Sequence, residues 1–410
     1  MCYNDKKSRK KVTIMDPRLT LCIDNCFAYK RWVKPLDWML LIRDMGLTHV
    51  EQSADTECDP LYMGADYMRQ WTEWVRRDSE KTGVRVVNVY SGHGTYTTCG
   101  MTHWHDGVRR RFLDEWMKAQ VDTAARIGAG FGFFAHGIQH SDLQTPEAYG
   151  ARLETLYDDL AELAAYAAEK RLPGICIEQM YTPHMPPWTI RGTEALMREV
   201  FARRGARMDV TIDLGHMNGQ QFFQRPAREA LLECLRTGAR APWLGTEAAH
   251  RLYREAAAGG IDADRAADAI LADVDANPHL FAGPEDCSIW NWVESLGQYA
   301  NIVHLQQTDG KSSPHWPFTD TYNRIGVASG EKLISSLAAA FARPAIEGLP
   351  EPVTDIALTL EPFVGTLANP YAAVDDIAQS VAYWRGFVPR DGMRLSEAAA
   401  LLAKDGNTVI

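Results

Sequence analysis

Four short apolar runs, each ending in an ionisable residue, constrain the fold of this chain more than any other feature of its sequence. They occupy residues 174–178, 208–213, 301–304 and 356–361, and they end at Glu178, Asp213, His304 and Glu361. An apolar, β-branched run bounded by turn residues is typical of a buried strand in a parallel sheet. A charged group inside such a strand would be costly unless it were paired or bound to a metal. At the C-terminal ends of the strands, the same groups would meet at the mouth of a barrel.

Strand-like and helix-like segments also alternate in the rest of the chain. We expect further strands at about 19–23, 49–51, 84–90 and 131–135. We expect helices at about 35–45, 68–82, 106–127, 145–170, 329–343 and 371–386, and a terminal helix at about 395–404. Such βαβ alternation produces a parallel sheet, and about eight units fit a closed barrel better than an open sheet. The sequence therefore predicts an α/β fold of the (β/α)8 TIM-barrel type.

The spacing of the runs predicts one interruption of this barrel. Asp213 and His304 lie about 90 residues apart, whereas Glu178 and Asp213 lie only 35 residues apart. After one barrel helix at about 226–236, we expect a largely helical, alanine-rich insertion at about 241–284. It would lie between strands six and seven and serve as a lid or an oligomer contact.

Composition excludes several classes of protein. The net charge of −10 and the pI near 5.7 argue against a nucleic-acid-binding surface and a polybasic membrane patch. The exception is a basic N-terminal tail at 1–15, which we expect to be flexible and to precede a single barrel domain at 16–410. No apolar stretch approaches the roughly 18 residues that span a bilayer. The eight cysteines are scattered without a CxxC pair, which favours free thiols in a reducing cytoplasm.

Three carboxylates and one imidazole form a donor set that suits hard or borderline divalent ions, namely Mn²⁺, Mg²⁺, Co²⁺ or Zn²⁺. A single strand-end carboxylate is as often a cap for the following helix, so the prediction depends on the ordered set of four. Gly215 would let the chain turn directly after the strand at 208–213, and His216 would then point back over the site. The sequence therefore predicts a metal-dependent enzyme.

The same segments carry a resemblance to a known family. Glu178, Asp213-Leu214-Gly215-His216, residues 304–310 and Leu360-Glu361-Pro362 resemble the strand-five to strand-eight motifs of the xylose-isomerase-like barrel superfamily. The resemblance extends over about 19–390 and is strongest in the C-terminal half, where it is similar to the ketose 3-epimerase branch of sugar isomerases and epimerases.

The resemblance implies roles for particular residues. The divalent ion, commonly Mn²⁺ in that branch, would be bound by Glu178, Asp213, His304 and Glu361. Glu178 and Glu361 would also be the catalytic acid and base, because they would approach the substrate from opposite faces. His216, together with an arginine after strand seven, here Arg324, would contact a carbohydrate substrate.

Four other residues are candidates for substrate binding by position, because they follow the expected strands three, four and five. They are His93, His136, Tyr181 and Trp188. Aromatic faces suit the C–H side of a sugar and imidazoles suit its hydroxyls, although each residue alone is as readily explained by loop packing. The long aromatic loop at 311–318 and the insertion depart from the compact epimerases, which favours a substrate other than a plain free hexulose.

The resemblance implies proton transfer through a metal-bound enediolate, which gives epimerisation or aldose–ketose isomerisation of a sugar or sugar derivative. A metal-dependent lyase or dehydratase acting on a keto-sugar or an inosose is the main alternative. A metal-free glycosidase would use Glu178 and Glu361 alone. An endonuclease would need an Asp-x-His after strand seven, and a non-catalytic sugar-binding barrel would not need the four donors. The resemblance also implies that the protein forms a homo-oligomer. We expect neither nucleic acid nor a membrane to be a partner.

Overall fold

The computed structural model describes residues 15–91 and 100–405. Nearly all of the predicted basic tail therefore lies outside the described residues. Within the described ranges, no helix is long and apolar enough to cross a membrane. The cysteines in these ranges are free thiols, and four of the six are buried.

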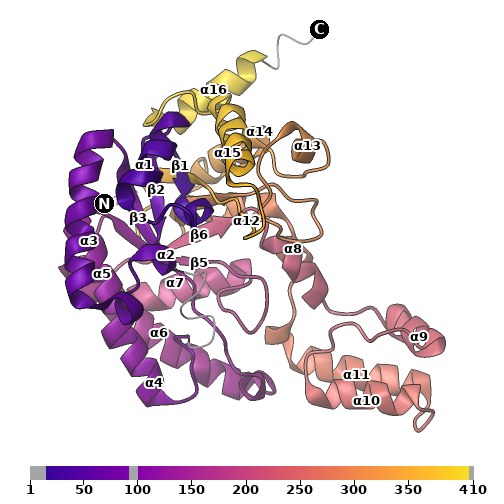
Figure 1. Cartoon of the computed structure of the whole chain (residues 1–410). Helices are drawn as coiled ribbons and strands as arrows, with labels where there is room; N and C mark the ends of the chain where they lie inside the picture. Colours follow the sequence, from indigo (N-terminus) through magenta and orange to yellow (C-terminus); the bar gives the residue numbers. More distant parts are fainter. Residues whose placement is uncertain (1–14, 92–99, 406–410) are drawn as a thin grey trace, which may run out of the picture.

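Eight parallel strands close into a barrel, which confirms the predicted fold (Figure 1). They are β1 (Arg18–Asp24), β2 (His49–Ser53), β3 (Arg85–Ser91), β4 (Gly130–Phe133), β5 (Ile175–Glu178), β6 (Asp209–Asp213), β7 (Ala300–Leu305) and β8 (Asp355–Leu360). Each strand pairs with the next along the chain, and β1 pairs with both β2 and β8. A short ninth strand, β9 (Met393–Arg394), pairs antiparallel with β1. The parallel register aligns the C-terminal ends of the strands, so the side chains that end them share one mouth.

Helices surround the strands, and each helix packs one of its faces against the barrel or a neighbouring helix. The principal ones are α1 (Pro35–Asp44), α3 (Pro60–Thr82), α5 (Lys118–Ile127), α6 (Pro146–Glu169), α7 (Ile190–Arg204), α12 (Ile289–Leu296), α14 (Gly330–Phe341), α15 (Pro370–Arg385) and the terminal α16 (Leu395–Asp405). Local sequence explains their ends: α3 begins after Asp59, whose carboxylate accepts hydrogen bonds from two backbone amides, and ends at Gly83 with a φ of 79°. The helix predicted at 106–127 is interrupted by a π-helical turn after α4 (Asp106–Arg111).

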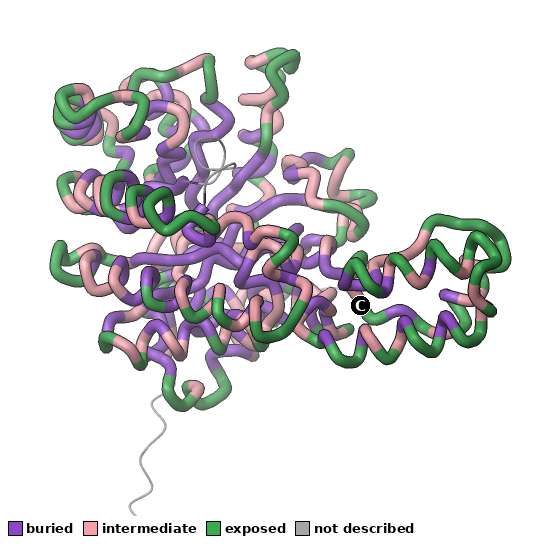
Figure 2. The backbone as a smooth tube through the Cα atoms, turned by 90° about the horizontal axis from the view of Figure 1, so that it is seen from below, coloured by how far each residue is buried: buried purple, intermediate pink, exposed green. Residues whose placement is uncertain are grey.

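Three helices project from the barrel and pack mainly on one another; we call them the arm. They are α9 (Arg228–Thr237), α10 (Glu247–Ala257) and α11 (Ala263–Ala276), shown at the lower right of Figure 1 and protruding in Figure 2. A separate apolar cluster fills the space between them, with Leu231, Tyr253 and Ile270 among its buried members. The arm lies between β6 and β7, where the sequence predicted an insertion.

One helix is placed differently from the expectation. The segment predicted at 226–236 as a barrel helix corresponds to α9, which packs on α10 and α11 rather than on the sheet. The barrel position is taken by α12, which contacts α7, α14 and β6. The physical reason is the apolar surface of the two helices: α12 buries Ile289, Trp292, Val293 and Leu296, whereas α9 buries only Leu231.

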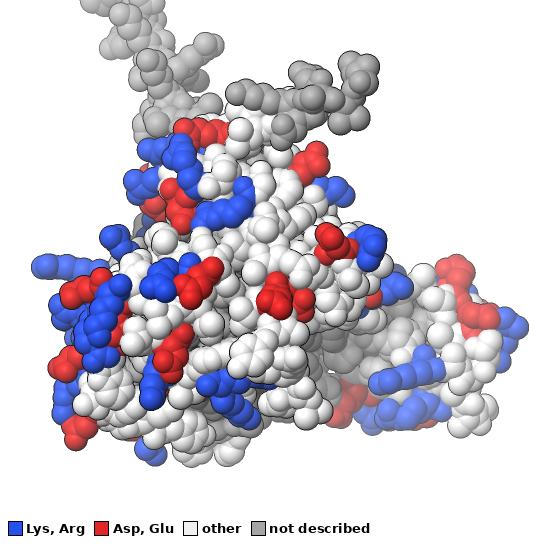
Figure 3. Space-filling model, turned by 45° about the horizontal axis from the view of Figure 1, so that its top comes forward, with Lys and Arg blue, Asp and Glu red and all other residues white. Residues whose placement is uncertain are grey.

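The charged surface is mixed. On the face shown in Figure 3, basic and acidic side chains are interspersed. Many such side chains are paired: Arg110 contacts Glu162, and Arg203 contacts Glu154 and Asp158. This interspersion gives no continuous basic stripe on the face that the figure shows.

Candidate metal centre

The four predicted ligand residues converge at the mouth of the barrel. Glu178 and Asp213 are the last residues of β5 and β6, His304 lies near the end of β7, and Glu361 follows β8 directly. The strand register sets Asp213 beside His304. One ligand atom from each of the four side chains lies within 4.8 Å of the others, and all four residues are buried. The structure thus brings the four together, and their role as ligands remains a prediction.

The imidazole of His304 lies between carboxylates on both sides. Its Nδ1 is 3.0 Å from Glu178 Oε1 and 3.2 Å from Glu361 Oε2. Its Nε2 is 3.0 Å from Oε2 of Glu51, which lies in the middle of β2. A carboxylate that accepts a hydrogen bond from the outer nitrogen of a histidine fixes the tautomer and turns the other nitrogen toward a metal. Glu51 therefore directs Nδ1 of His304 into the cluster.

Burial and mutual charge shift the protonation of these groups in opposite directions. Burial alone would lower the pKa of His304, but Glu361, Glu51 and Glu178 outweigh it, and the pKa lies well above the usual range. Burial alone would raise the pKa of Glu361, but His304 and His315 hold that pKa well below its usual value. Burial, Glu51 and Glu361 raise the pKa of Asp24 well above normal. The carboxylates thus compete for too few positive partners.

The donor set and its charge fit a divalent cation. Five carboxylates, on Asp24, Glu51, Glu178, Asp213 and Glu361, are all buried at the mouth. Three histidines, His216, His304 and His315, lie within 4.0 Å of these carboxylates. Within the described residues, Oδ2 of Asp213 is buried without a hydrogen-bond partner. An unsatisfied buried carboxylate oxygen is costly, and a bound cation would satisfy it. Three oxygen donors and one nitrogen donor suit Mn²⁺, Mg²⁺, Co²⁺ or Zn²⁺.

The turn after β6 holds both Asp213 and His216 in place. Oδ1 of Asp213 accepts hydrogen bonds from the backbone amides of Gly215 at 2.6 Å and His216 at 3.0 Å, and from Nε2 of Gln306 at 2.7 Å. A Cβ at position 215 would lie only 2.4 Å from the amide end of the Gln306 side chain, so a larger residue would displace Gln306 from Asp213. The tight turn brings His216 back over the mouth, as the sequence predicted.

His216 and Tyr181 face the cluster together. Nδ1 of His216 is 2.8 Å from the carbonyl oxygen of Gln179, which must accept its proton, so Nε2 remains for another partner. The ring of His216 meets that of Tyr181 edge to face, with centroids 5.1 Å apart. Burial raises the pKa of Tyr181, as do the carboxylates of Glu178 and Asp213. Both residues therefore adjoin the predicted ligands.

Sequence reasoning missed His315, which the structure brings to the same site. Its Nδ1 is 3.3 Å from Glu361 Oε2, and its ring stacks on Phe363 at 3.7 Å between centroids. Its φ of 51° is unusual for a residue with a side chain and indicates local strain. The sequence pointed to the long loop at 311–318, but nothing in it distinguished this histidine from its neighbours.

Glu51 was also missed, although a signal for it existed. Glu51 ends the strand that the sequence predicted at 49–51, as the four predicted ligands end theirs, and the structure buries it within β2. Tyr90, at the end of β3, likewise donates a hydrogen bond to Glu178 Oε2. Both residues orient the predicted ligands from the neighbouring strands.

A second group of possible ligands, Asp213, His216 and His315, also lies within 4.8 Å. Here the amide nitrogen of Gln306 is 2.7 Å from Asp213 Oδ1, 2.8 Å from Ser313 Oγ and 3.3 Å from His315 Nε2. A hydrogen-bond donor thus already serves this group. Of the two groups, the one that contains His304 is therefore the better candidate for the predicted ion.

The remaining predicted substrate contacts lie elsewhere or outside the described residues. Arg324 is exposed at the end of α13 (Asp320–Asn323), and within the described chain it forms no ion pair with the cluster. His136 is partly buried against Phe134, and burial lowers its pKa. Trp188 is buried and lines a separate cavity of about 490 Å³ beside α7. His93 lies outside the described residues.

Comparisons with solved structures show the same fold at low sequence identity. A protein from Rhodospirillum rubrum, provisionally described as a xylose isomerase, superposes with a TM-score of 0.64 at 18% identity, over 90% of this chain and 98% of that one. An L-ribulose 3-epimerase superposes with a TM-score of 0.54 at 12% identity, over 95% and 98%. A D-psicose 3-epimerase structure determined with D-fructose gives a TM-score of 0.51 at 13% identity, over 89% and 98%.

Sequence comparison agrees with the fold. No curated protein sequence matched the chain. Residues 39–251, about half of its length, match the profile of a family described as the xylose isomerase-like TIM barrel. The chain therefore belongs to the xylose isomerase-like TIM barrel family.

Proposed function

We propose that the protein is a divalent-metal-dependent isomerase or epimerase of a sugar or sugar derivative. The observation that carries this proposal is the convergence of Glu178, Asp213, His304 and Glu361 in one buried cluster with an excess of negative charge. Membership of the family supports the proposal, because proteins described as sugar 3-epimerases share this fold.

The side chains of the cluster suit proton transfer next to a carbonyl group. A divalent ion held by the four ligands would polarise a sugar carbonyl and so make the neighbouring C–H more acidic. Glu178 and Glu361 are two carboxylates on separate strands, so one can accept a proton and the other can return one. Tyr90 donates to Glu178, and His315 lies against Glu361, so each carboxylate is oriented by a different neighbour.

The outcome depends on where the proton returns. Return to the same carbon from the other side inverts that carbon, whereas return to the adjacent carbon interconverts ketose and aldose. Nε2 of His216 is available to bond a substrate hydroxyl, because Nδ1 already donates to the carbonyl of Gln179. We assign His216 and Tyr181 to substrate binding and Glu178 and Glu361 to proton transfer.

The geometry disfavours the glycosidase alternative. A glycosidase needs two carboxylates about 5 to 9.5 Å apart on opposite sides of an open gap. Here Glu178 Oε1 and Glu361 Oε2 lie 3.0 and 3.2 Å from the same nitrogen of His304, so both carboxylates contact one imidazole. Two carboxylates that share one imidazole match shared coordination better than attack on a glycosidic bond.

Isotope exchange tests the proposal. The protein is stripped with a chelator, reloaded with Mn²⁺, and incubated in D₂O with ketoses, aldoses, inososes and 3-keto sugars. We expect deuterium at a carbon beside a carbonyl, only in the metal-loaded sample, and in an epimerised or isomerised product. A dehydrated product would instead identify the lyase alternative. Full turnover in chelator, or by Glu361→Gln, would overturn the proposal.

A further inference from the structure

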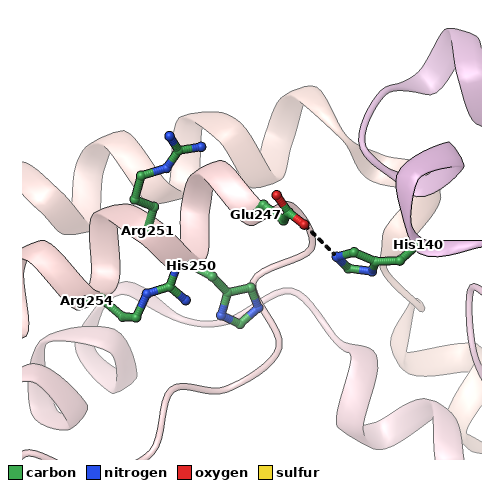
Figure 4. Close-up of a pocket in the computed structure, with 5 residues that line it drawn as sticks. All are labelled: His140, Glu247, His250, Arg251 and Arg254. Atoms are coloured by element: carbon green, nitrogen blue, oxygen red, sulfur yellow. Dashed lines mark ion pairs between the residues drawn. The ribbon is translucent and has the colours of Figure 1, made fainter.

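We propose that a pocket between the arm and the barrel binds an anionic group, a phosphoryl or a carboxylate group. This cavity of about 540 Å³, which we call the arm pocket, is shown in Figure 4. Its lining residues are His140, Glu247, His250, Arg251 and Arg254. It shares no residue with the cluster of Glu178, Asp213, His304 and Glu361, so the inference does not depend on the proposed function.

The two walls of the arm pocket come from different parts of the molecule. His140 begins a short 3-10 helix, η3 (His140–Leu143), in the segment after β4. The other four residues lie on α10 at spacings that place them along one face of the helix. The backbone amide of Glu247 donates to Oε1 of Gln144 at 2.8 Å, so α10 contacts the barrel segment beside the pocket. The cavity therefore lies where the arm meets the barrel.

The arginines of the arm pocket lack the carboxylate partners that three other arginines on or beside the arm have. Arg228 bonds Asp264 and Asp268 on α11, each at 2.7 Å. Arg225 and Arg236 are likewise paired with acidic residues. By contrast, neither Arg251 nor Arg254 has a carboxylate oxygen within 4.0 Å in the described part of the chain. Two unpaired guanidinium groups thus line one cavity, on a protein whose acidic residues outnumber its basic ones.

The histidines add donors, and Glu247 is the one opposing charge. Nε2 of His250 is 3.4 Å from the amide of Leu244 and accepts its proton, so Nδ1 of the neutral ring is a donor. Oε1 of Glu247 is 3.6 Å from Nε2 of His140, and Figure 4 shows the two side chains turned toward each other at one end of the pocket. Two guanidinium charges against one carboxylate leave the pocket net positive.

This chemistry selects the class of ligand. A guanidinium group presents a planar fork of N–H donors that matches the oxygens of a phosphoryl or carboxylate group. Arg251 and Arg254 lie three residues apart on one face of α10, so rotation of their long side chains would let both approach the same anion. A bound anion would also contact His140, and it would thereby link the arm to the barrel.

Binding of simple anions tests the inference. Inorganic phosphate and citrate are titrated into the full-length protein at constant ionic strength, and binding is followed by calorimetry and by the shift in melting temperature. We expect saturable binding that the double variant Arg251→Gln/Arg254→Gln weakens by about tenfold or more. The matched control is Arg240→Gln/Arg265→Gln, which removes two exposed arginines of the arm region that do not line the pocket.

The source of the anionic group is resolved in the same experiment. A ketose phosphate that binds more tightly than inorganic phosphate, through Arg251 and Arg254, would place a substrate group in the pocket. Equal binding of the two would indicate a free anion. The inference is overturned if the wild-type protein binds neither phosphate nor citrate saturably, or if both double variants bind equally well. Circular dichroism without anion checks that the variants are folded.

Discussion

The barrel mouth and the arm use charged residues in opposite ways. At the mouth, Glu178, Asp213 and Glu361 are buried and compete for a few imidazoles. On the arm, the half-buried Arg228 is paired across helices with the exposed Asp264 and Asp268. Exposed pairs contribute little to stability, whereas a buried, incompletely compensated charge is costly and is retained where it serves binding or catalysis. The difference indicates that the buried charges at the mouth serve binding or catalysis. The paired charges of the arm mainly keep its surface polar.

The largest expected effect is at the mouth. Glu361→Gln removes one proposed proton-transfer group and one ligand while keeping the size of the side chain. We expect deuterium exchange into the substrate to fall by about 10²- to 10⁴-fold. The matched control, Glu351→Gln, changes an exposed carboxylate and should leave the rate unchanged. Equal loss in both variants would remove the contrast between buried and exposed carboxylates.

A smaller effect on the site is expected from Glu51, which contacts His304 on the side away from the other predicted ligands. Glu51→Gln keeps a hydrogen-bond acceptor for Nε2 of His304 but removes the charge. We expect Mn²⁺ affinity, measured by calorimetry, to weaken by about tenfold to a hundredfold. Glu57→Gln is the control, because Glu57 is also buried but bonds Asn25, Gln52 and Trp71 rather than His304. Unchanged affinity in Glu51→Gln would show that Glu51 does not orient the histidine.

Cavity-forming substitutions should separate the stability of the two regions. Leu358→Ala in the barrel and Leu231→Ala in the arm each remove a fully buried side chain. We expect about 2–5 kcal/mol of destabilisation in each case, because the surrounding residues cannot fully close the cavity. Hydrogen exchange should show loss of protection throughout the barrel for Leu358→Ala and mainly in α9–α11 for Leu231→Ala. Uniform loss in the arm variant would mean that the arm and barrel unfold as one unit.

A buried carboxylate near the mouth should make stability depend on pH. Burial raises the pKa of Glu57 to about 7, although hydrogen bonds from Trp71, Gln52 and Asn25 act to lower it. The folded chain therefore keeps a proton on Glu57 that the unfolded chain releases near pH 4.5. The contribution of this proton to the free energy of unfolding is complete below that pH and is lost as pH rises through about 7. Denaturant titrations should show a decline of about 3 kcal/mol over this range that is absent from Glu57→Gln. The same decline in both proteins would assign it to another group.

The smallest effect is expected on the arm surface. Arg228→Gln breaks the pairs with Asp264 and Asp268, which are solvent-exposed. We expect no measurable change in melting temperature, because water and salt screen such pairs. A clear decrease would show that the ion pairs of the arm are structural, and the contrast with the mouth would weaken.

Much of the fold was predictable because its signals are local. Apolar runs mark strands such as β6, and helical periodicity marks α6, whose predicted limits differ from the observed ones by one residue at each end. The helix α12 was not predicted, and α9 was wrongly placed on the barrel. Both are short helices between β6 and β7, and their local sequence does not show which of them packs on the sheet. Buried apolar area, which depends on all the neighbours, decides between them.

Sequence alone determined that Glu178, Asp213, His304 and Glu361 lie at or beside the ends of strands, because a charge is tolerated there and costly within an apolar strand. A parallel barrel then requires strand ends to meet, so their convergence followed from the fold class. Only the tertiary structure decided that His315 joins them and that Arg324 does not. Both residues lie in the long segment after β7, and the path of such a segment depends on packing against distant parts of the chain, here Phe363, rather than on its own sequence.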